Sequence, residues 1–165
     1  MPLGCPLEPH ELEVCEATAL LTFYYRFYSQ MSDAAFDVAR GKALWAFYRE
    51  FSAAFKELYA VPVILPGGYT PAKIFTLYVL IARAFLRIFE NVLGASKPAG
   101  RLRAAIWESL FTYDLRRYGR SLCEQLGEFA TLISGPSGTG KEVVARTIAG
   151  CRFQTFDQKT QKFSL

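Results

Sequence analysis

The sequence predicts a mainly α-helical protein that ends in the first strand–loop–helix unit of an incomplete α/β domain. Three observations support this fold class. Apolar residues recur at steps of three and four through residues 9–126, as they do on one face of a helix. A short β-prone run, a glycine-rich turn and a helix-like segment then follow over residues 129–149. The composition, with 52% hydrophobic and 21% charged residues, is typical of a globular chain. We therefore place a helical region at residues 1–126 and the start of a second domain at residues 127–165.

The first two helices are predicted from their end signals and their apolar faces. Pro9 suits the first position of a helix that we expect to reach about Gln30. Ser32 or Asp33 is expected to cap the second helix. Gly41 is a weak point within it, because a glycine in a helix interior costs about 1 kcal/mol relative to alanine. The apolar stripe of this second helix comprises Leu44, Tyr48, Phe51, Phe55 and Leu58.

The third helix has the clearest signals in the sequence. It follows a connection over residues 61–69 that is rich in proline and glycine. Thr70 is expected to cap it, Pro71 to occupy its first position, and Gly94 to stop it. We expect this helix to be among the longest and most buried, so that Ile81→Asp would cost several kcal/mol. Its apolar stripe comprises Ile74, Leu77, Ile81, Phe85, Ile88 and Val92.

A change of pattern follows the fourth predicted helix. Residues 95–100 are expected to form a linker, and the fourth helix is expected to run from about Arg101 towards Leu126, with a bend or a split into two helices at Gly119. Residues 129–134 are short, apolar and β-prone, which predicts a strand, and residues 141–149 predict a helix. Residues 152–156 offer at most a second strand. The domain boundary is therefore expected near Gly127.

Charge and composition narrow the functional classes. The net charge is +4, and residues 97–165 carry +5 against −1 for residues 1–96, which suits an anionic ligand such as a nucleotide or a solvated surface. A single histidine argues against most histidine-based metal sites and catalytic triads. The four cysteines form no CxxC pair, so we expect reduced thiols in a cytoplasmic protein. The most apolar run, residues 74–82, is too short to cross a bilayer, and we expect no membrane contact.

One motif carries chemistry. Residues 135–141 read Gly-Pro-Ser-Gly-Thr-Gly-Lys and fit GxxxxGK, the phosphate-binding loop known as Walker A. Its glycines let backbone N–H groups turn inward around a phosphate, and the following helix directs its positive N-terminal end at the same place. Lys141 would add a charge at the β- and γ-phosphates. Glu142 stands where most such loops have a serine or threonine that binds Mg²⁺.

Glu142 and the residues around it also resemble a known family signature. Residues 134–148 read SGPSGTGKEVVARTI, and this run resembles the start of the AAA+ domain in sigma-54-interacting transcriptional regulators, the bacterial enhancer-binding proteins. The family signature there reads GESGTGKE, then Leu or Val, Val-Ala, Arg or Lys, any residue and Ile-His. Pro136 replaces the usual glutamate, and Ala149 replaces the usual histidine. The resemblance covers residues 129–149.

The resemblance implies a nucleotide-binding site. ATP or ADP is the implied ligand, and Mg²⁺ is expected only in a complete AAA+ domain. No residue is assigned a catalytic or metal-binding role. The implied nucleotide-binding residues are Gly135, Pro136, Ser137, Gly138, Thr139, Gly140, Lys141 and Glu142.

The resemblance also implies a role in sigma-54-dependent transcription, with sigma-54 RNA polymerase as the partner of the full-length family. A complete domain of this family has a Walker B strand, a GAFTGA loop that engages sigma-54, a sensor region and arginine fingers. The sequence after Lys141 has room for none of these, so we expect the front part of a longer protein or the product of a truncated gene. For this chain alone we expect weak nucleotide binding or none, no ATP hydrolysis and no direct DNA contact. Oligomers are expected only with a complete AAA+ domain.

An alternative is a helical sensory or protein-interaction domain with a vestigial P-loop. The helical region lacks the patterns of receiver, PAS and GAF modules, so its role stays open between signal input, oligomer contact and a lead-in packed against the ATPase. Aromatic residues beside arginines, at residues 23–28 and 111–118, could stack on nucleic-acid bases. Helical spacing favours a core role for most of them.

Overall fold

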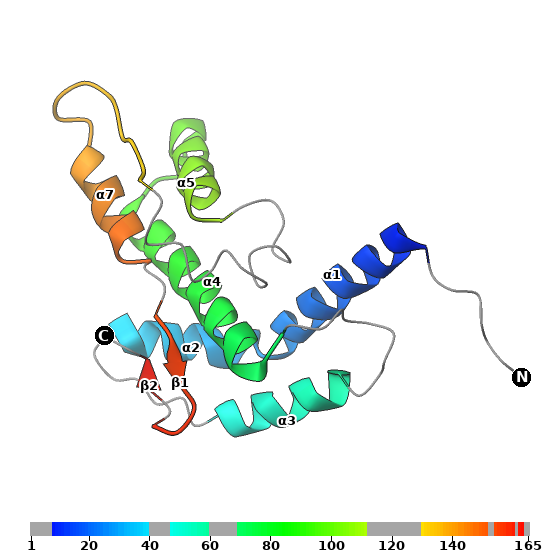
Figure 1. Cartoon of the computed structure of the whole chain (residues 1–165). Coiled ribbons are helices and arrows are strands. Elements are labelled where there is room, and N and C mark those ends of the chain that lie inside the picture. Colours follow the sequence, from blue (N-terminus) through cyan, green and yellow to red (C-terminus); the bar gives the residue numbers. More distant parts are fainter. Residues whose placement is uncertain are drawn as a thin grey trace, which may run out of the picture.

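The computed structural model describes residues 8–39, 47–59, 69–111, 130–151, 154–160 and 162–163. This part of the chain is mainly helical, as the sequence predicts, with six helices and one two-stranded sheet (Figure 1). Among the described residues, no helix combines the length and the apolar character needed to cross a membrane. The elements are α1 (Pro9–Arg26), α2 (Tyr28–Ala39), α3 (Tyr48–Tyr59), α4 (Pro71–Asn91), α5 (Lys97–Leu110), α7 (Lys141–Ala149), β1 (Phe156–Asp157) and β2 (Lys162–Phe163).

Helix α4 forms the centre of the molecule. The Thr70 hydroxyl oxygen accepts a hydrogen bond from the Lys73 N–H at 3.2 Å, and Pro71 is the first helical residue, so the predicted start is confirmed. With 21 residues α4 is the longest of the described helices, and it packs against α2, α3, α5, α7 and β1. A helix contacted from several sides must be apolar nearly all round, and residues 74–80 are all buried. The helix ends at Asn91, before the expected stop at Gly94.

A break at Phe27 separates α1 from α2. The expectation of one continuous helix to about residue 30 is therefore wrong. Ser32 and Asp33 do not cap a new helix, because both lie inside α2. The buried Phe27 ring packs against the rings of Phe23 and Phe51, with centroids 5.2 and 5.1 Å away. This burial outweighs the modest local preference of serine and aspartate for a cap position.

Aromatic rings form the core between α1, α3 and α4. On α3, Tyr48, Phe51 and Phe55 are buried and Leu58 is partly buried, which confirms this part of the predicted stripe. The Phe75 ring of α4 lies 5.0 Å from that of Tyr48 and 5.1 Å from that of Phe51, centroid to centroid. Edge-to-face pairs of this kind add stability beyond the area that they bury.

Two buried hydrogen bonds attach α1 to the centre of the fold. The Tyr69 hydroxyl donates to Glu16 Oε1 at 2.7 Å, and the Tyr78 hydroxyl donates to the Leu20 carbonyl at 2.5 Å. Glu16 is only 2% exposed. Its carboxylate therefore belongs to the interior and does not simply complement the dipole at the start of α1.

Helix α5 starts earlier than expected. The Ser96 hydroxyl oxygen caps it by accepting from a backbone N–H at 3.3 Å, and Pro98 lies in its first turn. Residues 97–100 are therefore helical, and the expected linker at residues 95–100 is wrong for most of its length. A serine with a proline two residues later, in the first turn, is itself a helix-start signal. Arg103 joins α5 to the end of α4 by donating to the carbonyls of Val92 and Gly94 at 2.8 and 2.9 Å.

The strand expected at residues 129–134 is not formed by the described residues of that run. Residues 130–134 are irregular and mostly exposed, with Leu132 at 92%. A strand needs a neighbour that pairs its N–H and C=O groups, and the described strands pair only with each other. They form a short antiparallel hairpin in which Phe156 lies opposite Phe163. The predicted helix at residues 141–149 is confirmed as α7.

Some expectations fall outside the described residues. These are the weak point at Gly41, Leu44 of the second stripe, the fourth helix beyond Phe111 with its bend at Gly119, and the boundary near Gly127.

Candidate functional site

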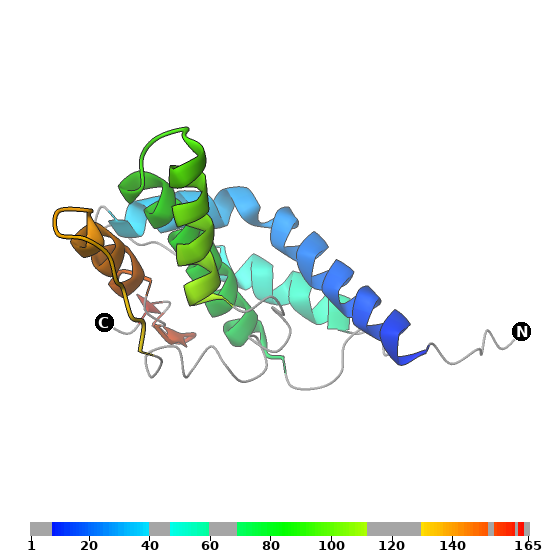
Figure 2. The same ribbon diagram turned by 90° about the horizontal axis from the view of Figure 1, so that it is seen from above.

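The glycine loop lies at the end of the molecule formed by α5, α7 and the last turns of α4, while α1 extends away on the opposite side (Figures 1 and 2). Gly138 and Gly140 have φ angles of +78° and +82°, a left-handed conformation that other residues rarely adopt. A Cβ added at either position would meet no atom within 4 Å. The backbone conformation, rather than crowding, is therefore what requires glycine in the loop.

Lys141 folds back over the loop that precedes it. Its Nζ donates to the carbonyls of Gly135 and Pro136 at 2.9 and 2.5 Å. The Thr139 hydroxyl donates to the same Pro136 carbonyl at 2.8 Å. These contacts bring four of the predicted site residues together, and Ser137 lies exposed in the turn between them.

The start of α7 is open to an anion. Gly140 is its N-cap residue and has no side chain, so no side-chain hydrogen bond caps the first turn. The first N–H groups of a helix have no intrahelical partner and carry partial positive charge. Together with the Lys141 ammonium they can take up an oxyanion.

Glu142 is directed along α7. Its Oε1 accepts a hydrogen bond from the Arg146 guanidinium at 2.5 Å, one helical turn further on. Both side chains are largely exposed. This ion pair draws the carboxylate towards the middle of the helix and away from the loop, which reduces the repulsion that Glu142 would exert on a bound phosphate.

Two arginines of α4 hold the opposite end of α7. Arg83 donates to Gln154 Oε1 at 2.5 Å and to the Gly150 carbonyl at 3.4 Å. The Arg87 side chain lies so close to Gly150 that an added Cβ there would be 3.0 Å from it. Burial, together with the charge of Arg87, lowers the pKa of Arg83. Cations are favourable at this end of a helix, where the carbonyls lack partners.

Cys151 completes this anchor. Its thiol is buried and donates to the Thr147 carbonyl at 3.2 Å, while the Thr147 hydroxyl donates to the Val143 carbonyl at 2.8 Å. Burial raises the pKa of Cys151 to about 11, although Arg83 and Arg87 act in the opposite direction. The thiol is therefore protonated at neutral pH and acts as an apolar contact.

The sequence analysis missed the anchor and found the loop. The loop is a contiguous motif, whereas Arg83 and Arg87 belong to a different helix. The sequence signal that could have predicted this contact is the pair of arginines one helical turn apart in a largely apolar helix. Within the described ranges, no group of three or more histidine, cysteine, aspartate or glutamate side chains could hold a metal ion.

Comparison of the chain with protein-family models, with curated proteins and with solved structures gave no match.

Proposed function

We propose that residues 135–142 bind the phosphates of ATP or ADP. The observation that carries this proposal is the conformation of the loop, in which glycines with positive φ precede a lysine folded over the loop carbonyls. The helix that follows starts without a side-chain cap. Glycines with positive φ, a lysine ammonium and a helix N-terminus are the parts from which a phosphate site is built.

A bound phosphate would replace the internal contacts of Lys141. The ammonium would leave the carbonyls of Gly135 and Pro136 and pair with phosphate oxygens, and this charge-assisted contact is stronger than a bond to a neutral carbonyl. The free N–H groups in the first turn of α7 would donate to the same phosphate. Glu142 would stay paired with Arg146 and add little repulsion.

We further infer that residues 127–165 are the start of an AAA+ domain of the kind found in sigma-54-interacting transcriptional regulators. The GTGKE motif, the run that follows it and the loop conformation support this proposal. Regulation of sigma-54-dependent transcription is the corresponding process. In such a domain residues 130–134 would form the strand that precedes the loop and would need neighbouring strands to pair with.

Calorimetric titration of the 165-residue chain with ADP, ATP and adenosine tests the binding proposal. We expect ADP and ATP to bind weakly and adenosine, which lacks phosphate, not to bind. Lys141→Ala should weaken the binding of ADP about tenfold to a hundredfold, because it removes a charge-assisted contact of about 1.5–3 kcal/mol.

The matched control is Lys97→Ala, which removes an exposed lysine from the first turn of α5 and should leave the affinity unchanged. Equal affinity of Lys141→Ala and the parent chain would contradict the proposal. If no nucleotide binds at all, the helical sensory or interaction domain with a vestigial loop becomes the better explanation.

A further inference from the structure

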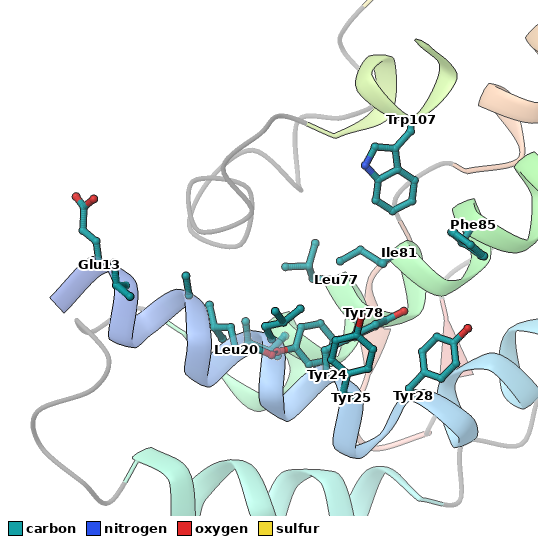
Figure 3. A pocket seen from close by; sticks show the side chains of 14 residues that line it. Glu13, Leu20, Tyr24, Tyr25, Tyr28, Leu77, Tyr78, Ile81, Phe85 and Trp107 are labelled. Carbon is teal, nitrogen blue, oxygen red and sulfur yellow. The ribbon is translucent and has the colours of Figure 1, made fainter. Parts of the chain in front are cut away.

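A half-open cavity of about 780 Å³ lies between α1, α4 and α5, away from the glycine loop. In Figure 3, Leu77 and Ile81 of α4 lie between Trp107 of α5 and the tyrosines of α1 and α2. Small-molecule sites have volumes of about 300–1,000 Å³ and are enclosed on several sides by apolar groups. The cavity therefore has the size and the setting of a ligand site.

The walls of the cavity expose apolar surface that a folded chain normally buries. Tyr25 is 66% exposed, Val14 62%, Leu21 54% and Phe85 49%. All four residues line the same cavity. A contiguous apolar patch of this kind marks a binding site, whereas single exposed apolar residues need no explanation.

Aromatic rings supply much of the lining. Trp107 and Phe85 face each other edge to face across the α4–α5 side, with centroids 6.5 Å apart. On the other side, Tyr24 packs edge-on against Tyr78 at 5.1 Å and against Tyr28 at 5.8 Å. The lining rings are held at several angles, so they can present both faces and edges to the ring of a ligand. Aromatic pairs prefer such edge-to-face and offset-stacked arrangements.

The charges around the cavity disfavour an anion. Glu13 is a carboxylate at one end, and no lysine or arginine is among the lining residues that the structure describes. Burial and the neighbouring Tyr28 and Tyr25 raise the pKa of Tyr24 to about 12, so this phenol stays neutral. An anion placed here would lose its hydration without gaining a cationic partner.

We propose that this cavity binds an uncharged small molecule that contains an aromatic ring. The ring would be taken up between the aromatic side chains of α1, α4 and α5, and the tyrosine hydroxyls would orient any polar substituent. This ligand site is distinct from the phosphate-binding loop, and the inference does not depend on nucleotide binding.

Two fluorescent dyes that differ by one charged group test the inference. N-phenyl-1-naphthylamine is uncharged and aromatic, and 8-anilino-1-naphthalenesulfonate is the same ring system with a sulfonate. We expect the full chain to bind the uncharged dye at about one molecule per chain, and to bind the sulfonate about tenfold more weakly or worse. Equal affinity for the two dyes would overturn the inference.

Filling the cavity should weaken dye binding. Ala17 is an exposed lining residue of α1, so Ala17→Phe would project a ring into the space. We expect it to weaken the uncharged dye about tenfold or more, because the added ring takes its place. Ala53→Phe makes the same change at an exposed position of α3 outside this cavity, and should bind the dye like the parent chain.

A second variant changes the charge instead of the volume. Phe85→Lys places a cation at the half-exposed rim, and should weaken the uncharged dye while strengthening the sulfonate. Circular dichroism of each variant shows whether it has folded. Unchanged dye binding by folded Ala17→Phe and Phe85→Lys would overturn the inference. Sedimentation provides a further test. If the parent chain binds no dye but forms a dimer that Ala17→Phe disrupts, the apolar patch is a contact between two copies of the chain, and the inference is overturned.

Discussion

Cys151 is the residue whose surroundings alter its chemistry most clearly. It is 1% exposed beneath α7, and its thiol donates to a helix carbonyl near two arginines of α4. Two nearby cations would favour a thiolate, but burial opposes ionisation more strongly and raises the pKa of the thiol to about 11. The residue is therefore part of the packing between α4 and α7 and is a poor nucleophile at neutral pH.

The stability of the protein should fall as the pH rises above about 9. The unfolded thiol ionises near its ordinary pKa of 9.0, whereas the folded thiol keeps its proton until about pH 11. In this window the unfolded state binds fewer protons, so a higher pH favours unfolding. Urea unfolding at a series of pH values measures the effect. Cys151→Ala should flatten the profile between about pH 9 and 10, and Cys15→Ala should not; the same profile in both variants would count against the buried thiol as the cause.

At the scale of an element, α4 has two kinds of apolar position. Both Ile74 and Ile81 line the cavity beside α1, but Ile74 is 0% exposed, whereas Ile81 is only half-buried. Helical spacing alone puts both on one stripe. The energetic cost of truncation should therefore differ, because the fully buried side chain loses more packing contacts than the half-buried one.

We expect Ile74→Ala to lower the free energy of unfolding by about 2–4 kcal/mol. Ile81→Ala should lower it by only about 1 kcal/mol, since much of that side chain already faces an open space. Ile81→Asp should likewise lower the free energy of unfolding by less than the several kcal/mol expected from the sequence. An aspartate should be tolerated worse at Ile74 than at Ile81. Denaturant unfolding of the two alanine variants decides the matter: equal losses would mean that Ile81 is core after all.

Helix α5 offers a position where a substitution should stabilise the protein. Gly100 lies inside the helix, and an added Cβ would meet no atom within 4 Å. Gly100→Ala should raise the free energy of unfolding by about 0.5–1 kcal/mol, because alanine loses less backbone entropy than glycine. Gly138→Ala is the matched control, since it too has open space but a φ of +78°. It should not stabilise the chain and should weaken ADP binding; a stabilising effect at both positions would show that φ does not matter in the loop.

At the scale of the whole molecule, α4 joins the two sites. Leu77, Ile81 and Phe85 line the cavity on one side, and Arg83 and Arg87 hold the end of α7 on another. The glycine loop depends on α7 for its position. Among the described elements, α7 packs mainly against α4 and α5. The position of the loop is therefore set by the helical part of the chain.

Removing the arginine contacts should loosen α7 selectively. Arg83→Met keeps an apolar stem but loses the donors to Gln154 and the Gly150 carbonyl. Amide hydrogen exchange in residues 141–151 should become about tenfold faster, while α2 and α3 stay protected. Arg101→Met changes an exposed arginine of α5 and serves as the control. Faster exchange throughout the chain would instead indicate a global loss of stability, and no change in α7 would show that Arg83 does not anchor it.

The sequence by itself determined the features that depend on neighbouring residues. Thr70 and Pro71 start α4, the glycines and Lys141 define the loop, and residues 141–149 form a helix. A cap, a turn and a helical period are decided within one or two turns of chain, so a local pattern is sufficient to predict them. The chemistry assigned to the loop was equally local.

Only the tertiary structure decided which distant residues meet. The buried Glu16 accepts a hydrogen bond from Tyr69, 53 residues further on, and Arg83 donates to the Gly150 carbonyl at the end of α7, 67 residues away. Residues 130–134 are irregular although their composition favours a strand, since a strand exists only where another pairs with it. The cavity between α1, α4 and α5 likewise depends on how three helices pack, and periodicity shows which face of each helix is apolar but not whether another element covers it.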